Sequence, residues 1–153
     1  MSFDPSTDTA AAHRHFAADC FNRAWGFIEK ATRTRDEDEQ MIGLAHASLW
    51  HWTQREDCTA ENLSAGYWQV SRVYALAGLT EQARRYAEMC LHVSRGEAPF
   101  YLGYAHEALA RAAARAGDPE EARWHLAQAR RQAEAVTDDE GRKLLLDDLD
   151  TIG

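Results

Sequence analysis

The chain has 153 residues and a formal net charge of −8, with 45% hydrophobic and 27% charged residues. This length fits one domain, and the composition is that of a folded globular protein rather than a disordered chain. The acidic balance argues against nucleic acid as a partner, because phosphate binding needs clustered lysine and arginine. We therefore expect a single domain over residues 1–153, with residues 1–7 as a flexible N-terminus.

The periodicity of apolar residues is helical along almost the whole chain, and no segment alternates as a strand does. In chain order it predicts seven helices: residues 8–32, 34–56, 60–77, 80–95 and 99–116, one that begins at Pro119, and a last one that begins after Thr137. The connections are short, as between neighbouring antiparallel helices. The sequence therefore predicts an all-α fold.

The predicted helix ends carry specific local signals. Thr34 with Glu37, and Thr137 with Glu140, have the spacing of a capping box. Thr59 and Asp118 are predicted N-caps, and prolines open the helices after residues 98 and 118. Three glycines stand where a left-handed residue ends a helix: Gly78, Gly96 and Gly117.

Two six-residue segments, Gly78–Ala83 (GLTEQA) and Gly117–Ala122 (GDPEEA), align without gaps. In each, the glycine ends one helix and the alanine lies in the next, at a point where two helices must cross closely. This pattern resembles the tetratricopeptide repeat (TPR), a helix–turn–helix unit. The resemblance is carried by Tyr67, Val70, Tyr74, Gly78, Ala83, Tyr86, Cys90 and Leu91, and again by Leu109, Gly117, Pro119, Ala122, Leu126 and Ala129.

The resemblance covers about half of the chain and implies a TPR-like stack of three antiparallel helical hairpins plus a C-terminal capping helix. Segments such as Ala45–Trp52 and Ser71–Tyr74 are also similar to a group of uncharacterised bacterial TPR-like proteins, which implies no function. Independently of the family, each hairpin is apolar on more than one face, so it has to share its burial with stacked neighbours.

The TPR-like resemblance also implies a concave groove lined by the first helix of each pair. Its groove positions fall on Trp68, Arg72, Leu76, Tyr104, Glu107, Arg111 and Arg115. Trp68, Arg72 and Leu76 lie four apart, as do Glu107, Arg111 and Arg115, which agrees with one shared face in each helix. An aromatic wall with guanidinium groups suits a peptide carboxylate or an acidic side chain, with Trp68, Arg72, Tyr104 and Arg111 as anchors. The alternative is that Glu107 and Arg111 form a solvated pair and that Trp68 is partly core.

A second candidate site is the aromatic and imidazole-rich segment His46–Trp52. Its pocket would be formed by His46, Ser48, Trp50 and His51, against the third helix. The alternative is that Leu49 and Trp52 are core while Ser48 and His51 make local hydrogen bonds. His46 and His51 point to different sides of a helix, so we expect no metal site and no cofactor.

The chain contains no GxGxxG, P-loop or GxSxG motif, so we expect no enzymatic activity. No segment is long and apolar enough for a membrane span or a signal peptide, and the three cysteines are widely spaced, which favours the reducing cytoplasm. We expect a non-enzymatic module that binds a peptide segment or partner protein with acidic or carboxylate groups in the concave groove. The alternatives are a small-molecule or metal-binding regulatory protein that uses His46–Trp52, and a homodimer.

Overall fold

The structure is a computed structural model that describes residues 5–152. These residues form seven helices and no strand, which confirms the all-α prediction. The helices are α1 (Pro5–Ile28), α2 (Arg35–Thr53), α3 (Ala60–Leu76), α4 (Thr80–Ser94), α5 (Pro99–Arg115), α6 (Pro119–Ala135) and α7 (Asp139–Leu149). Of the predicted N-terminal segment 1–7, residues 1–4 lie outside the described part, and the described backbone is helical from Pro5.

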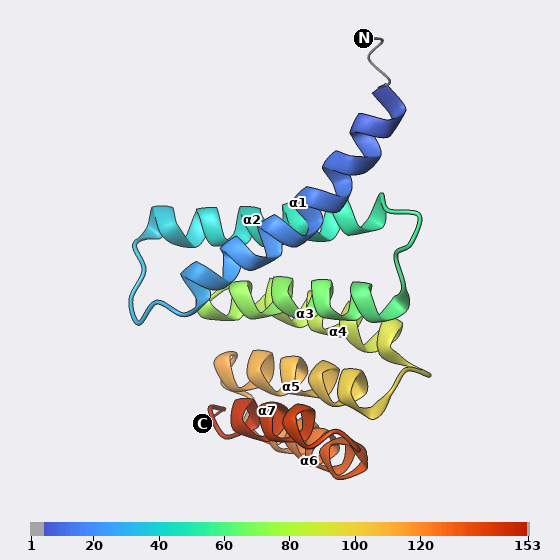
Figure 1. Ribbon diagram of the computed structural model, residues 1–153. Coiled ribbons are helices and arrows are strands. Elements are labelled where there is room, and N and C mark those ends of the chain that lie inside the picture. The colour runs from blue at the N-terminus through green and yellow to red at the C-terminus, as the bar shows by residue number, and fades with distance from the viewer. Residues whose placement is uncertain (1–4, 153) are drawn as a thin grey trace.

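The helices pack in adjacent pairs, α1 with α2, α3 with α4, and α5 with α6 (Figure 1). The pairs follow one another from the N-terminal end of the molecule to the C-terminal end, where α7 packs on α5 and α6. The odd-numbered helices α1, α3, α5 and α7 also contact one another in that order. They therefore form one continuous layer of the molecule. Within residues 5–152, no helix combines the length and the apolar character that crossing a membrane requires.

The helix starts agree with the predicted caps except at α7. Thr34 Oγ1 accepts from the Glu37 backbone N–H at 3.2 Å, and Glu37 Oε2 accepts from the Thr34 N–H at 3.0 Å, which completes the predicted capping box. The box predicted at Thr137 is wrong, because Asp138 is the N-cap of α7 and accepts from the Gly141 N–H at 2.8 Å. A carboxylate is a better N-cap than a threonine hydroxyl, so the helix begins one residue later.

The two aligned glycines end α3 and α5 in the same conformation. Gly78 and Gly117 both have φ of 78°, a left-handed value that costs glycine little. The N–H groups of the residues that follow reach back to the carbonyls of Tyr74 and Ala113, both at 2.9 Å. The alanines five residues on, Ala83 and Ala122, are buried, as predicted for a close helix crossing.

The burial of α5 is the densest in the described chain. Every residue from Gly103 to Ala113 is buried, because α3 and α4 pack on one side and α6 and α7 on the other. Glu107, Arg111 and His106 lie in this buried stretch. The centre of the molecule is therefore a helix whose ionisable groups must find partners inside the protein.

Candidate functional site

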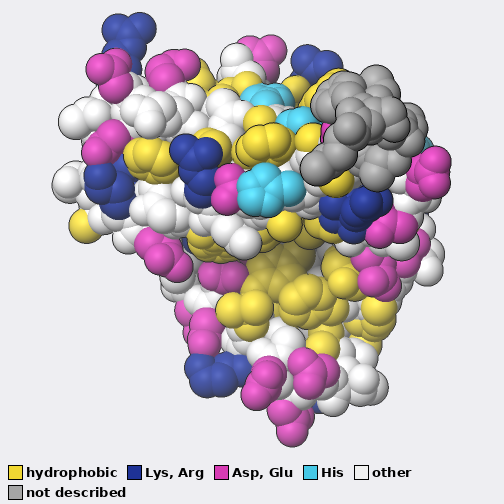
Figure 2. Space-filling model, turned by 45° about the horizontal axis from the view of Figure 1, so that its top comes forward, with side chains coloured by type: hydrophobic (Ala, Val, Ile, Leu, Met, Phe, Trp, Pro, Cys, Tyr) yellow, Lys and Arg dark blue, Asp and Glu magenta, His cyan; other side chains and the backbone are white. Residues whose placement is uncertain are grey.

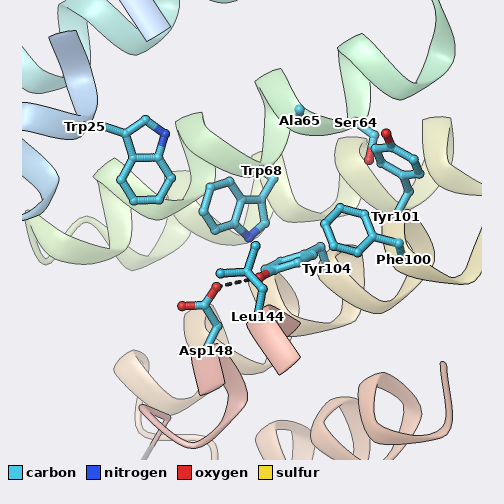
Figure 3. Close-up of a pocket in the computed structure, with 9 residues that line it drawn as sticks. All are labelled: Trp25, Ser64, Ala65, Trp68, Phe100, Tyr101, Tyr104, Leu144 and Asp148. Atoms are coloured by element: carbon cyan, nitrogen blue, oxygen red, sulfur yellow. Dashed lines mark hydrogen bonds between the residues drawn. The ribbon is translucent and has the colours of Figure 1, made fainter. Parts of the chain in front are cut away.

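A pocket of about 220 Å³ opens on the layer formed by the odd-numbered helices. All four of these helices contribute to its wall, which consists of Trp25, Ser64, Ala65, Trp68, Phe100, Tyr101, Tyr104, Leu144 and Asp148 (Figure 3). Figure 2 shows hydrophobic side chains gathered in a hollow of this face, with charged side chains around it. We call this site the aromatic pocket.

The aromatic rings of the pocket pack at different angles to one another. The ring centroids of Trp25 and Trp68 are 5.6 Å apart with an interplanar angle of 31°, and those of Trp68 and Tyr104 are 5.4 Å apart at 79°. Phe100 packs on Tyr104 at 5.0 Å and 65°. Tilted and edge-to-face pairs of this kind fix the ring positions. The pocket wall is therefore preformed, and it presents both ring faces and ring edges.

Behind the aromatic pocket, Glu107 holds three side chains through its carboxylate. Oε2 accepts from Trp68 Nε1 at 2.6 Å, while Oε1 accepts from Arg72 Nη1 at 3.1 Å and from Arg111 Nε at 2.9 Å. Glu107 is 0% exposed and Arg111 is 8% exposed. The alternative of a solvated Glu107–Arg111 pair is therefore wrong. Hydrogen bonds to a buried charge of this kind are strong and orient the Trp68 ring.

Helix α7 completes the site from the C-terminal end. Asp148 Oδ2 accepts from the Tyr104 hydroxyl at 2.6 Å, as the dashed line in Figure 3 shows. Arg111 Nη2 donates to the Asp148 carbonyl at 3.2 Å and to Thr151 Oγ1 at 2.7 Å. Helix α7 is therefore tied both to the pocket wall and to the Glu107 carboxylate network beneath it.

Burial dominates the electrostatics of this region. It lowers the pKa of the Arg72 guanidinium, although the Glu107 carboxylate opposes this effect. Burial and the hydrogen bond to Asp148 raise the pKa of the Tyr104 hydroxyl far above its ordinary value. Tyr104 is therefore a permanent donor to the Asp148 carboxylate at any physiological pH.

The structure brings five of the seven predicted groove residues together: Trp68, Arg72, Tyr104, Glu107 and Arg111. It does not place the other two with them. Leu76 packs in the apolar cluster between α1, α2 and α3, and Arg115 is exposed near the end of α5. Trp68 is 8% exposed and belongs to the main core cluster, as the alternative proposed.

The four residues of the predicted second pocket do not all contact the same helix. His46 Nε2 lies 2.8 Å from the Tyr74 hydroxyl, and Ser48 Oγ donates to the Ala17 carbonyl at 2.7 Å. His51 lies against α1, and Trp50 is 55% exposed. His46 therefore lies against α3, whereas Ser48 and His51 lie against α1, and the Trp50 ring packs on that of His51 at 5.0 Å. The local hydrogen bond that the alternative proposed for Ser48 is wrong, because Ser48 donates to a different helix.

Two histidine pairs link neighbouring helices. His13 Nδ1 and His51 Nδ1 lie 2.9 Å apart between α1 and α2, and His106 Nδ1 and His125 Nδ1 lie 3.0 Å apart between α5 and α6. Burial, and then the charge of His125, lower the pKa of His106 to about 4. Residues 5–152 contain no group of three or more His, Cys, Asp or Glu side chains placed to hold a metal ion. The short distance between the two Nδ1 atoms makes each pair a hydrogen bond between two helices.

No protein-family model matches the chain, and neither the curated proteins nor the solved structures give a match. Sequence reasoning indicated only two of the nine residues that line the pocket, Trp68 and Tyr104. The residues that it missed include Trp25, Phe100, Tyr101, Leu144 and Asp148, which lie on α1, α5 and α7. The available signal was the excess of aromatic residues on the odd-numbered helices outside the predicted core stripes. This excess did not indicate that residues from three separate helices would meet in one pocket.

Proposed function

We propose that this protein is a TPR-like repeat module that binds a segment of a partner protein on the face formed by α1, α3, α5 and α7. In this proposal α1/α2, α3/α4 and α5/α6 are the three stacked hairpins and α7 is the capping helix. The paired packing of the helices and the matching turns at Gly78 and Gly117 support the stack. The module acts by binding rather than by catalysis, and we place it in the cytoplasm, where its free cysteines stay reduced.

The observation that carries the proposal is the aromatic pocket, which draws its wall from all four helices of one layer. Exposed aromatic surface in a preformed hollow is typical of sites that receive a side chain of another protein. Its volume of about 220 Å³ lies below the roughly 300–1,000 Å³ of ligand pockets. The pocket therefore suits one anchoring side chain of a longer segment.

This proposal does not require the partner segment to carry a carboxylate. Arg72 and Arg111, which were predicted to bind it, already donate to Glu107 inside the protein. A partner carboxylate would have to compete with that buried acceptor. The proposal therefore rests on the aromatic pocket rather than on the two arginines.

Site-specific photo-crosslinking in the native cells tests this function. A benzophenone amino acid replaces Ala65, which lines the pocket, or Ala127, which is exposed on α6. We expect a crosslinked partner from position 65 alone. Its segment, identified by mass spectrometry and synthesised, should then bind the purified protein.

The affinity of that segment is then measured for two variants. Leu144→Ala removes an exposed side chain at the pocket and should weaken binding about tenfold, whereas Trp124→Ala removes an exposed side chain on α6 and should change nothing. Equal crosslinking at both positions, or unchanged binding by Leu144→Ala, overturns the proposal. A second copy of the chain as the crosslinked species also overturns it, since the face is then a dimer interface.

A further inference from the structure

One acidic side chain lines the aromatic pocket, and it limits which side chain of the partner segment can bind there. Asp148 lines the pocket and is only half-buried. Its Oδ2 accepts from Tyr104, and within residues 5–152 no hydrogen bond or ion pair reaches Oδ1. Figure 3 shows this second oxygen pointing away from Tyr104. The hydrogen bond to Oδ2 thus holds the carboxylate in place, while Oδ1 can accept a hydrogen bond from an occupant of the pocket.

An occupant must satisfy both parts of this site. A purely apolar side chain would cover the rings but would also take Asp148 Oδ1 out of water, because Tyr104 donates only to Oδ2. Burial of an oxygen without a hydrogen bond is costly. An acidic side chain would add repulsion from Asp148. A cation with an apolar stem satisfies the rings and the carboxylate together, because ring faces attract positive charge.

Among the two basic side chains, arginine fits better than lysine. A guanidinium group is planar and weakly hydrated, so it enters an aromatic site more easily than an ammonium and can also pair with a carboxylate. Guanidinium groups of the described chain lie over aromatic rings at three places: Arg55 Cζ is 4.1 Å from the Trp52 ring centroid, Arg85 Cζ is 5.6 Å from that of Tyr86, and Arg72 Cζ is 5.8 Å from that of Trp68.

Resting on the proposed function, we infer that the aromatic pocket receives an arginine side chain of the partner segment, with its stem against the rings and its guanidinium group on Asp148. The charge around the pocket agrees with a basic segment. Glu61 and Glu97 lie close enough to Tyr101 to add to the rise that burial causes in its pKa. The net charge of −8 also favours the approach of a cationic segment.

Short alanine peptides, capped at both ends, test the inference with arginine, citrulline or phenylalanine at the centre. Citrulline has nearly the shape of arginine without its charge. Binding is followed by NMR of the tryptophan indole N–H signals in the purified full chain. We expect the arginine peptide to bind at least about tenfold more tightly than the citrulline peptide.

Two neighbouring carboxylates give a matched pair of variants. Asp148→Asn should reduce the preference for arginine over citrulline about tenfold, to near unity. Asp147→Asn removes the same charge from an exposed residue that pairs with Lys143 and should keep the preference. Circular dichroism confirms that both variants remain folded.

The outcomes separate this inference from the proposed function. If citrulline or phenylalanine binds as tightly as arginine, or if Asp147→Asn and Asp148→Asn behave alike, the arginine anchor is wrong. No binding of the arginine peptide up to about 10 mM also overturns it. The proposed function itself stands or falls on the crosslinking at position 65, which does not depend on which side chain fills the pocket.

Discussion

Helices α5 and α1 carry the same pair of charges at the same spacing, with opposite surroundings. In α5, Glu107 and Arg111 have side chains 1% and 10% exposed, and their closest atoms lie 2.8 Å apart. In α1, Asp19 and Arg23 have side chains 36% and 63% exposed and lie 3.7 Å apart. Helices pack on several sides of α5, whereas α1 lies at one end of the molecule (Figure 1). The position of a helix in the stack, rather than its local sequence, decides whether such a pair matters for stability.

The largest expected effect comes from removing one charge of each pair. Glu107→Gln keeps the shape of the side chain but leaves two arginines buried without their carboxylate, so we expect a loss of about 3–5 kcal/mol in the free energy of unfolding. Asp19→Asn, the matched change in α1, should cost less than about 0.5 kcal/mol. Urea denaturation measures both values. Similar losses would show that the two pairs are equivalent.

The glycines of the two helices give a second contrast. At Gly103 in α5, an added Cβ would lie 2.6 Å from Leu145 Cδ2 and 3.3 Å from Gln132 Cβ. Leu145 is 0% exposed and belongs to the main core cluster, so displacing its side chain would disturb the core packing. Gly103→Ala should therefore destabilise the protein by about 1–3 kcal/mol.

At Gly26 in α1, no atom lies within 4 Å of an added Cβ. Gly26→Ala should stabilise the protein by about 0.5–1 kcal/mol, because alanine loses less backbone entropy in a helix. The two variants should thus have opposite signs in thermal melts. A shift of the melting temperature in the same direction for both would contradict the contrast.

His106, which pairs with His125 between α5 and α6, should make stability depend on pH. Because the pKa of His106 is about 4 in the folded protein and roughly 6.5 in an unfolded chain, the unfolded state binds more protons between these values. Stability is therefore complete above about pH 6.5 and falls as the pH decreases toward 4, by about 2 kcal/mol between pH 7 and pH 5.

The matched variants are His106→Gln and His51→Gln, measured by urea denaturation at several pH values. His106→Gln should remove most of that pH dependence. His51 is partly exposed, and burial also lowers its pKa, so His51→Gln should remove a smaller part. If both substitutions removed the same part of the pH dependence, burial would not distinguish the His106–His125 pair from the His13–His51 pair.

The sequence predicted the parts of the fold that depend on neighbouring residues. The capping box at Thr34 and the glycine turn at Gly78 are local, so their residues were sufficient to locate the helix ends. The start of α7 was predicted one residue too early, because Thr137 and Asp138 are both acceptable caps. The spacing of Glu107 and Arg111 correctly placed them on one face of a helix. Their burial could not be predicted from this spacing, because it depends on how other helices, such as α7, pack on that face.

The candidate site depends on contacts between distant helices, so less of it could be predicted. The resemblance indicated Trp68 and Tyr104, which do line the aromatic pocket. Trp25 and Leu144 are far from them in the sequence, and only the packing of α1 and α7 against the central helices places them there. The spacing of residues in the sequence shows which side chains share a face of one helix, but it does not show which residues of different helices meet.

Helix α7 links occupancy of the pocket to the local stability of the C-terminus. It is the shortest of the described helices, with 11 residues, and it provides both Leu144 and Asp148 to the pocket wall. Any occupant that contacts these two side chains binds only while α7 is docked. Amide hydrogen exchange in α7 should therefore slow as the site fills, by a factor that grows with the occupant's concentration relative to its dissociation constant.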